Sequence, residues 1–162
     1  MTQNSRRYPA YPLLGVGALI FRQDTGRRDD SILLVERGHE PLKGHWSLPG
    51  GLVETGELLS RAVEREILEE TGLVIQPLRV FEIFERIMRD PSGRAEYHYV
   101  LVDFLCKVRS GELHAADDVS NVQWVCRGAL ENFHLTEGTL GVIEKAFDAR
   151  RMLRSNARRK RS

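Results

Sequence analysis

The stretch from Gly51 to Leu73 constrains this chain more than any other part of its 162 residues. A glycine-containing turn leads into a run of apolar and charged residues with helical spacing, and this run stops at Thr71-Gly72. A glycine at that point supplies the left-handed backbone on which many helices end. The stretch therefore predicts a single helix from about Leu58 to Thr71.

The apolar runs on either side of this helix are short and rich in β-branched and aromatic residues, which is typical of strands. We expect two strands before the helix, joined as a hairpin through a turn at Arg22 to Asp30. We expect three strands after it, the first two joined through the turn residues Asp90 to Gly93. The predicted strands cover residues 15–21, 32–35, 80–88, 97–108 and 122–125.

A last helix is predicted from Thr136, acting as its N-cap, to about Met152, with Leu140, Ile143 and Phe147 on its inner face. The order β-β-α-β-β-β-α indicates the α+β class, in which a mixed, mostly antiparallel sheet is flanked by helices. We expect one domain over residues 11–150.

Composition favours a soluble, cytoplasmic protein. The chain is 41% hydrophobic and 29% charged, and no apolar run approaches the roughly 20 residues of a membrane helix. Residues 1–7 lack the apolar centre of a signal peptide. We therefore expect no membrane partner, and we expect Cys106 and Cys126 to be free thiols.

The end of the chain differs from its body in charge. Residues 150–162 carry seven basic side chains and no acidic one, so the formal net charge of +1 hides an acidic body. We expect residues 151–162 to be a disordered, solubilising tail. The alternative is that this tail contacts the backbone of a nucleic acid.

The glutamates of the central helix do not lie on a wholly solvated face. On a helical wheel Glu66 and Glu70 fall about 20° either side of Leu59, and Glu69 lies at the edge of the same sector. Burying carboxylates together costs several kcal/mol per ion unless something pairs them. A hard divalent cation would compensate for that cost.

An ordinary charged face that pairs with arginines is the alternative interpretation. The shared sector argues against it, and so do Gly50 and Gly51, which let backbone come close to a bound ion. Glu57, near the start of the helix, also suits the positive end of the helix dipole. The residues therefore indicate a metal site.

The whole stretch resembles the Nudix box, residue for residue, and no fixed position departs from the family pattern. The segment from Gly44 to Gly50 also resembles the lead-in of that family. The matching positions are Gly51, Glu57, Arg65, Glu66, Ile67, Glu69, Glu70, Gly72 and Leu73.

This resemblance implies a Nudix α/β/α sandwich and a hydrolase that depends on Mg²⁺ or Mn²⁺. Such enzymes cleave the diphosphate of a nucleoside diphosphate linked to another group. At the matching family positions, the resemblance implies that Glu66 and Glu70 are metal ligands and that Glu69 is a further ligand. The carbonyl of Gly50 or Gly51 is an added ligand, and Arg65 orients carboxylates by pairing with Glu57.

The general base and the phosphate contacts stay open. Glu69 is one candidate for the base, and the loop acids Asp117, Asp118 and Glu112 are the others, although a solvated acidic turn explains those acids equally well. Arg37, Lys43 and Arg86 are candidates for holding phosphate, with ordinary surface charges as the alternative.

Similarity to small bacterial members described as ADP-ribose pyrophosphatases favours ADP-ribose or a related nucleotide sugar as substrate. The alternatives are a nucleoside triphosphate pyrophosphatase of the MutT type and an RNA 5′-pyrophosphohydrolase. A nucleotide-sensing module without catalysis is the alternative of another class. Many members of the family form dimers, so the resemblance also implies a homodimer. No apolar stripe in the sequence itself establishes one.

Overall fold

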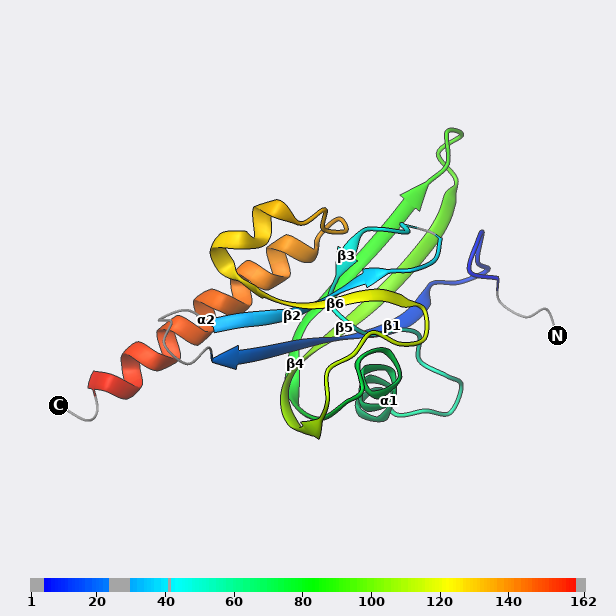
Figure 1. Ribbon diagram of the computed structural model, residues 1–162. Helices are drawn as coiled ribbons and strands as arrows, with labels where there is room; N and C mark the ends of the chain where they lie inside the picture. The colour runs from blue at the N-terminus through cyan, green and yellow to red at the C-terminus, as the bar shows by residue number, and fades with distance from the viewer. Residues whose placement is uncertain (1–4, 24–29, 41, 160–162) are drawn as a thin grey trace.

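The computed structural model describes residues 5–23, 30–40 and 42–159, and Figure 1 shows their arrangement. The order of elements follows the predicted one, with a short strand and a 3-10 helix added. The elements are β1 (Leu13–Gln23), β2 (Asp30–Arg37), β3 (Trp46–Ser47), α1 (Leu59–Thr71), β4 (Leu73–Arg89), β5 (Ala95–Gly111), β6 (Val119–Cys126), η1 (Arg127–Asn132) and α2 (Thr139–Arg159).

The strands form one mixed, six-stranded sheet in the order β3-β2-β1-β5-β4, with β6 paired to β2. The β1–β5 pair is parallel and the other pairs are antiparallel. Both predicted hairpins are present, but β1 and β2 pair over only three residues, starting at Phe21↔Ile32. The two strands therefore separate along most of their length.

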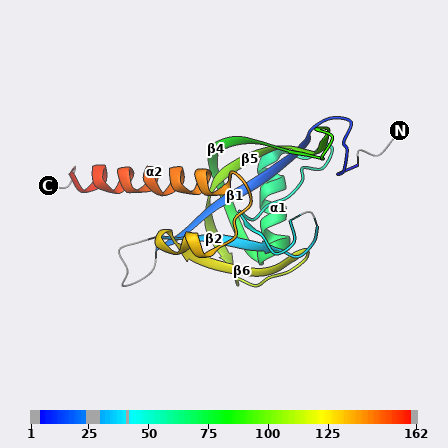
Figure 2. The same cartoon turned by 90° about the horizontal axis from the view of Figure 1, so that it is seen from above.

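The two long helices cover opposite faces of the sheet (Figures 1 and 2). Alternate residues of β1 explain this, because successive side chains of a strand point to opposite faces. Ala18 and Ile20 pack in a cluster with Val63 and Ile67 of α1. Leu19 packs in the other cluster with residues of α2, including Ile143. The predicted α/β/α sandwich is confirmed.

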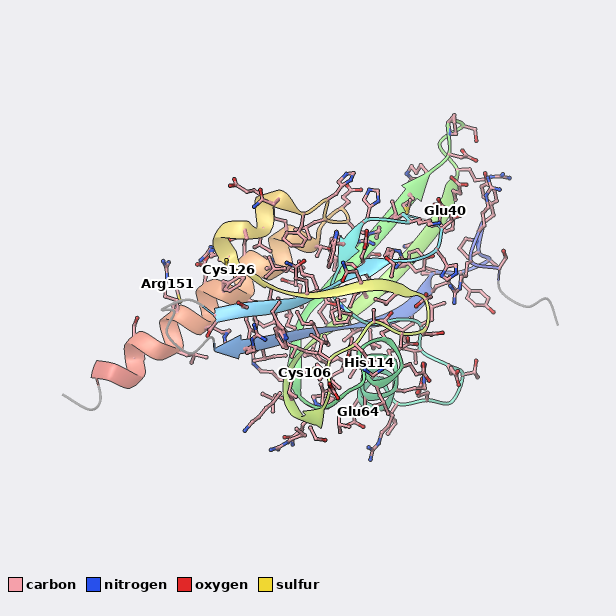
Figure 3. The ribbon with its side chains drawn as sticks, in the orientation of Figure 1. Glu40, Glu64, Cys106, His114, Cys126 and Arg151 are labelled. Atoms are coloured by element: carbon pink, nitrogen blue, oxygen red, sulfur yellow. The ribbon has the colours of Figure 1, made fainter. Side chains whose placement is uncertain are left out.

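Helix α1 follows the sequence prediction closely. It begins at Leu59 and ends at Thr71, and Gly72 takes a φ of 71° while its N–H donates to the carbonyl of Leu68. The predicted free thiols are also confirmed, since Cys106 and Cys126 are unpaired. They lie on β5 and β6 (Figure 3).

Strand β4 is longer than predicted, because it begins directly after the helix cap at Leu73 rather than at Val80. Pro77 argues against a strand at that point, since proline cannot donate to a sheet. However, β4 is the edge strand beside β5, and its register shifts between Pro77 and Arg79. An edge position with a bulge tolerates the proline.

The prediction for the last helix was wrong at both ends. Helix α2 begins at Thr139, and the Thr136 hydroxyl contacts the Thr139 hydroxyl at 2.7 Å and accepts a hydrogen bond from Arg86. Leu140, predicted to face inward, is 48% exposed, whereas Ile143 and Phe147 are buried as predicted.

The tail expected to be disordered from residue 151 is helical as far as Arg159. Helix α2 extends beyond one end of the sheet in both views (Figures 1 and 2). Residues 160–162, and most of the turn predicted at 22–30, lie outside the described residues. No described helix combines the length and the apolar character that crossing a membrane requires.

Candidate active site

The segment that leads into α1 runs along β1, where β2 has moved away. The N–H of Val16 donates to the carbonyl of Gly51 at 2.9 Å, and the N–H of Ala18 donates to Pro49 at 2.9 Å. Farther along, the N–H of Val53 donates to Leu14 at 3.0 Å. These bonds fix the approach to the helix against the centre of the sheet.

Glycines are needed in this segment because its backbone lies too close to its neighbours for a side chain. Gly50 has a φ of 145°, and a Cβ there would overlap with the carbonyl oxygen of Val16. A Cβ at Gly51 would overlap with the carboxylate of Glu66. The N–H of Gly50 donates to Glu70 Oε2 at 2.8 Å, so the segment touches two of the glutamates of α1.

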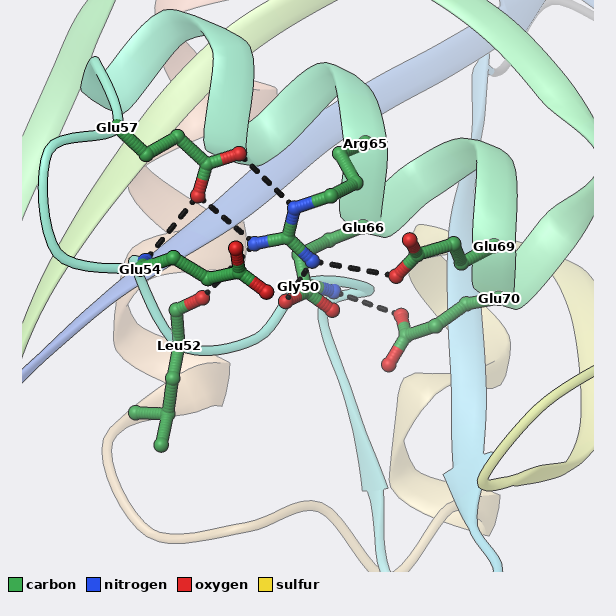
Figure 4. A network of polar contacts seen from close by, with 8 residues as sticks. All are labelled: Gly50, Leu52, Glu54, Glu57, Arg65, Glu66, Glu69 and Glu70. Carbon is green, nitrogen blue, oxygen red and sulfur yellow. Dashed lines mark hydrogen bonds and ion pairs between the residues drawn. The ribbon is translucent and has the colours of Figure 1, made fainter. Parts of the chain in front are cut away.

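Arg65 holds the carboxylates in place (Figure 4). Its Nε and Nη2 each donate to one oxygen of Glu57, both at 2.9 Å. Its Nη1 donates to Glu66 at 2.8 Å and to Glu69 at 3.2 Å. Such a planar, two-pronged arrangement is one that a lysine does not reproduce. The pairing of Arg65 with Glu57 expected from the sequence is therefore present.

The buried carboxylates of this cluster have too little positive charge nearby to compensate for their own negative charge. Glu70 is 5% exposed, and burial, followed by the nearby Asp118 and Glu66, raises its pKa to about 8 despite the hydrogen bond from Gly50. Burial also raises the pKa of Glu66, while Arg65 opposes that shift. Arg65 keeps the pKa of Glu57 below its usual value. The wheel thus placed Glu66 and Glu70 correctly, toward the interior.

Glu66, Glu69 and Glu70 line a cleft with a volume of about 380 Å³. Two of the candidate phosphate ligands, Arg37 and Arg86, line the same cleft. Arg86 Nη2 donates to Thr136 Oγ1 at 3.0 Å and to the carbonyl of Glu137 at 2.7 Å, whereas its buried Nε has no hydrogen-bond partner among the described residues. The cleft therefore presents carboxylates and guanidinium groups to the same space.

The remaining predicted residues divide into two groups. Asp117 and Asp118 line the cleft, and Asp117 has a strained φ of 56°. Lys43 and Glu112 are exposed and do not line it. The structure therefore gives Lys43 no position from which to hold a ligand in this cleft.

Sequence reasoning did not single out Arg6 and Asp103, two charged residues that line the cleft. Asp103 carried the clearest signal, because it is the only acidic residue inside the apolar run from Tyr97 to Val108. Arg6 lies in an irregular segment whose position no local pattern predicts.

The donor set suits a hard divalent cation. No three His, Cys, Asp or Glu side chains of the described residues converge as a ready-made metal site, because Glu66 and Glu69 turn toward Arg65. Their oxygens nevertheless share one helix face with the buried Glu70, and hard cations prefer oxygen ligands. The carbonyl of Gly51 already accepts from Val16. The Gly50 carbonyl accepts no hydrogen bond from the described residues, so it suits a cation better.

Comparison with known proteins agrees with this geometry. The family profile of the NUDIX domain matches residues 12–145. The chain belongs to the Nudix family. A curated ADP-ribose pyrophosphatase of Methanocaldococcus jannaschii is 36% identical over 121 residues, which cover 74% of this chain and 66% of that protein.

The names of two further relatives also refer to ADP-ribose. The ADPR responsive transcriptional repressor of Acinetobacter baylyi is 35% identical over 101 residues, or 60% of this chain and 39% of the repressor. The NUDIX domain of Shewanella oneidensis NrtR, solved in complex with ADP ribose, superposes with a TM-score of 0.69 at 26% identity. That match covers 86% of this chain and 88% of the solved one. The chain spans less than two thirds of the length of these curated relatives.

Proposed function

We propose that this protein hydrolyses the diphosphate of a nucleoside diphosphate derivative in a reaction that depends on a divalent cation, with ADP-ribose as the favoured substrate. One observation carries the proposal: Arg65 holds Glu57, Glu66 and Glu69 beside the buried Glu70. This cluster faces a cleft that also contains Arg37 and Arg86.

The glutamates have the role of holding the cation, and Mg²⁺ or Mn²⁺ fits their oxygens. Glu66, Glu69 and Glu70 would bind it together with the Gly50 carbonyl. When bound, the cation neutralises charge on the phosphate oxygens and makes water more acidic. Arg65 orients the carboxylates, and Arg37 and Arg86, which line the same cleft, bind the phosphate oxygens.

A carboxylate accepts the proton of the attacking water. Glu69 is the candidate on α1, because its side chain is 46% exposed and reaches solvent in the cleft. Asp117 and Asp118 are the candidates from the loop. Oxygen from water bonds to one phosphorus while the bond from that phosphorus to the bridging oxygen breaks, so ADP-ribose yields AMP and ribose 5-phosphate.

The names of the relatives favour ADP-ribose, since one is an ADP-ribose pyrophosphatase and another was solved with ADP ribose bound. The ADPR responsive repressor supports a second candidate, a domain that binds ADP-ribose without cleaving it. The complete set of box carboxylates in this chain favours catalysis, because a sensor needs no cation over the diphosphate.

A substrate panel with and without Mg²⁺ tests the proposal, with products separated by chromatography. The panel contains ADP-ribose, a nucleotide sugar, the nucleoside triphosphates and 5′-triphosphate RNA. We expect ADP-ribose to give AMP and ribose 5-phosphate with the highest kcat/KM, and only with metal. Faster cleavage of a triphosphate or of RNA would refute the substrate assignment, and tight binding of ADP-ribose without any product would favour the sensor.

A further inference from the structure

Asp103 on β5 is a buried acid in the cleft that the proposed reaction does not use. It is 5% exposed and lines the same cleft as the glutamates of α1. Its neighbour across the parallel β1–β5 pair is Gly17, where a Cβ would overlap with Asp103 Oδ1. Gly17 in turn lies against Gly50. The absence of a side chain at Gly17 therefore makes the space that the Asp103 carboxylate occupies.

This carboxylate has no partner in the described part of the chain. The other two buried acids found there are both satisfied, since Arg150 donates to Asp30 at 2.8 Å and Gly50 donates to Glu70 at 2.8 Å. No hydrogen bond or ion pair reaches Asp103 from a described residue, and only the longer-range charges of Arg86 and Glu82 act on it. An unpaired buried charge costs several kcal/mol, so its presence calls for an explanation.

Charge limits what Asp103 can bind. A carboxylate repels phosphate, and the glutamates of α1 already account for the cation of the proposed reaction. The partner left for Asp103 is an uncharged group that donates hydrogen bonds. The group next to the diphosphate in a nucleoside diphosphate derivative is a ribose, whose neighbouring hydroxyls match the two oxygens of a carboxylate. Acidic side chains have the same role toward ribose in dinucleotide-binding folds. Burial raises the pKa of Asp103 to about 6, so the group is an acceptor at neutral pH.

We propose that Asp103 is a specificity-determining residue that accepts hydrogen bonds from the hydroxyl groups of a ribose adjoining the diphosphate. The inference rests on the proposed function and extends it. It makes the protein selective for ribonucleotide derivatives over their deoxy counterparts, because a deoxy sugar leaves the buried carboxylate without a partner.

The test compares ADP-ribose with two analogues at saturating Mg²⁺, one with 2′-deoxyadenosine and one with 2-deoxyribose at the other end. The wild type is expected to lose about 10- to 100-fold in kcat/KM with at least one analogue, and that analogue identifies which ribose is bound. Asp103→Asn should lower kcat/KM for ADP-ribose by a similar factor, mainly through KM, and remove the preference. Glu82→Gln is the matched control, since Glu82 pairs in register with Asp103 on β4 but lies outside the cleft and binds Lys145 at 2.6 Å. This variant should keep the preference.

Equal kcat/KM for all three substrates in the wild type would overturn the inference. An Asp103→Asn variant whose kcat falls by the same factor for every substrate would also overturn the inference, because that result would indicate a role in proton transfer. A preference that follows the nucleobase rather than the hydroxyls would also overturn it.

Calorimetric binding of the products separates this inference from the proposed function. The binding affinities of ribose 5-phosphate and AMP are compared with those of their deoxy forms, and this measurement requires no turnover. If no substrate is hydrolysed, the proposed function fails, and stronger binding of the ribose forms would still support Asp103. Circular dichroism monitors folding of Asp103→Asn. If the variant does not fold, the wild-type comparison of ribose and deoxyribose forms decides.

Discussion

At the scale of single residues, this protein concentrates negative charge where it is costly. Glu70 is buried with one hydrogen bond, and Asp118 and Glu66 lie near enough to raise its pKa further. Arg65 compensates for Glu57, Glu66 and Glu69 but donates nothing to Glu70. The stored repulsion is what a divalent cation would relieve, so metal binding and stability should be linked through Glu70.

This linkage predicts a pH dependence of stability. In metal-free buffer the free energy of unfolding should fall as pH rises from about 6 to about 8, because the folded protein then holds a proton on Glu70 that the unfolded chain has released. The usual pKa is 4.5 and the folded pKa is about 8, so the fall extends from about pH 4.5 to about pH 8, and the interval from about 6 to about 8 lies inside that range. Urea unfolding at the two pH values measures the effect.

Glu70→Gln should lose this fall, and Mg²⁺ should stabilise the wild type more at the higher pH. Glu64→Gln serves as the control, since Glu64 lies on the same helix and pairs with Arg61 at 2.7 Å. Identical pH slopes for the wild type and Glu70→Gln would show that Glu70 is not protonated in the folded state.

At the scale of elements, the sequence predicted α1 well because two independent signals agreed there. The helical spacing placed Glu66 and Glu70 with Val63, and Gly72 marked the end. The predictions failed where tertiary context outweighed local preference. Pro77 is tolerated because β4 is an edge strand. Thr136 bonds to Arg86 and Thr139 instead of capping α2.

The site was predictable only in part for the same reason. The carboxylates of α1 follow one another along the chain, so their spacing reports their position. Asp103, Arg86 and Arg37 come from three different strands, and only the pairing of β1, β2, β4 and β5 brings them into one cleft. No local pattern in the sequence specifies that juxtaposition.

The turn before α2 is an element whose packing supports the cleft. Gly138 has a φ of 81°, and a Cβ there would overlap with the ring of Phe84, which lines the cleft. Gly138→Ala should therefore destabilise the protein by about 1–3 kcal/mol and lower activity.

Gly141→Ala is the matched control, because Gly141 lies inside α2 with open space around its Cα. This change should stabilise the protein by about 0.5–1 kcal/mol, since alanine favours a helix. Denaturant unfolding of both variants tests the pair. Equal stability of the two variants would show that the Gly138 turn does not constrain Phe84.

At the scale of the whole molecule, the two helices on opposite faces of the sheet contribute different parts of the cleft. Helix α1 packs on one face and supplies the carboxylates, while α2 packs on the other face and lines the cleft through Thr139 and Val142. The segment before α1 passes along β1 and joins the two sides. Membership in the Nudix family and this arrangement together support hydrolysis of a diphosphate over a bound cation.

The most direct test of that claim is the Mg²⁺-dependent release of AMP from ADP-ribose by the wild type, Glu70→Gln and Glu64→Gln, measured side by side with equal amounts of folded protein. We expect Glu70→Gln to lower kcat by about 100-fold or more, because a proposed ligand of the cation is lost. Glu64→Gln should stay near the wild-type value, since Glu64 pairs with Arg61 and does not line the cleft. Turnover by Glu70→Gln at the wild-type rate would contradict the account.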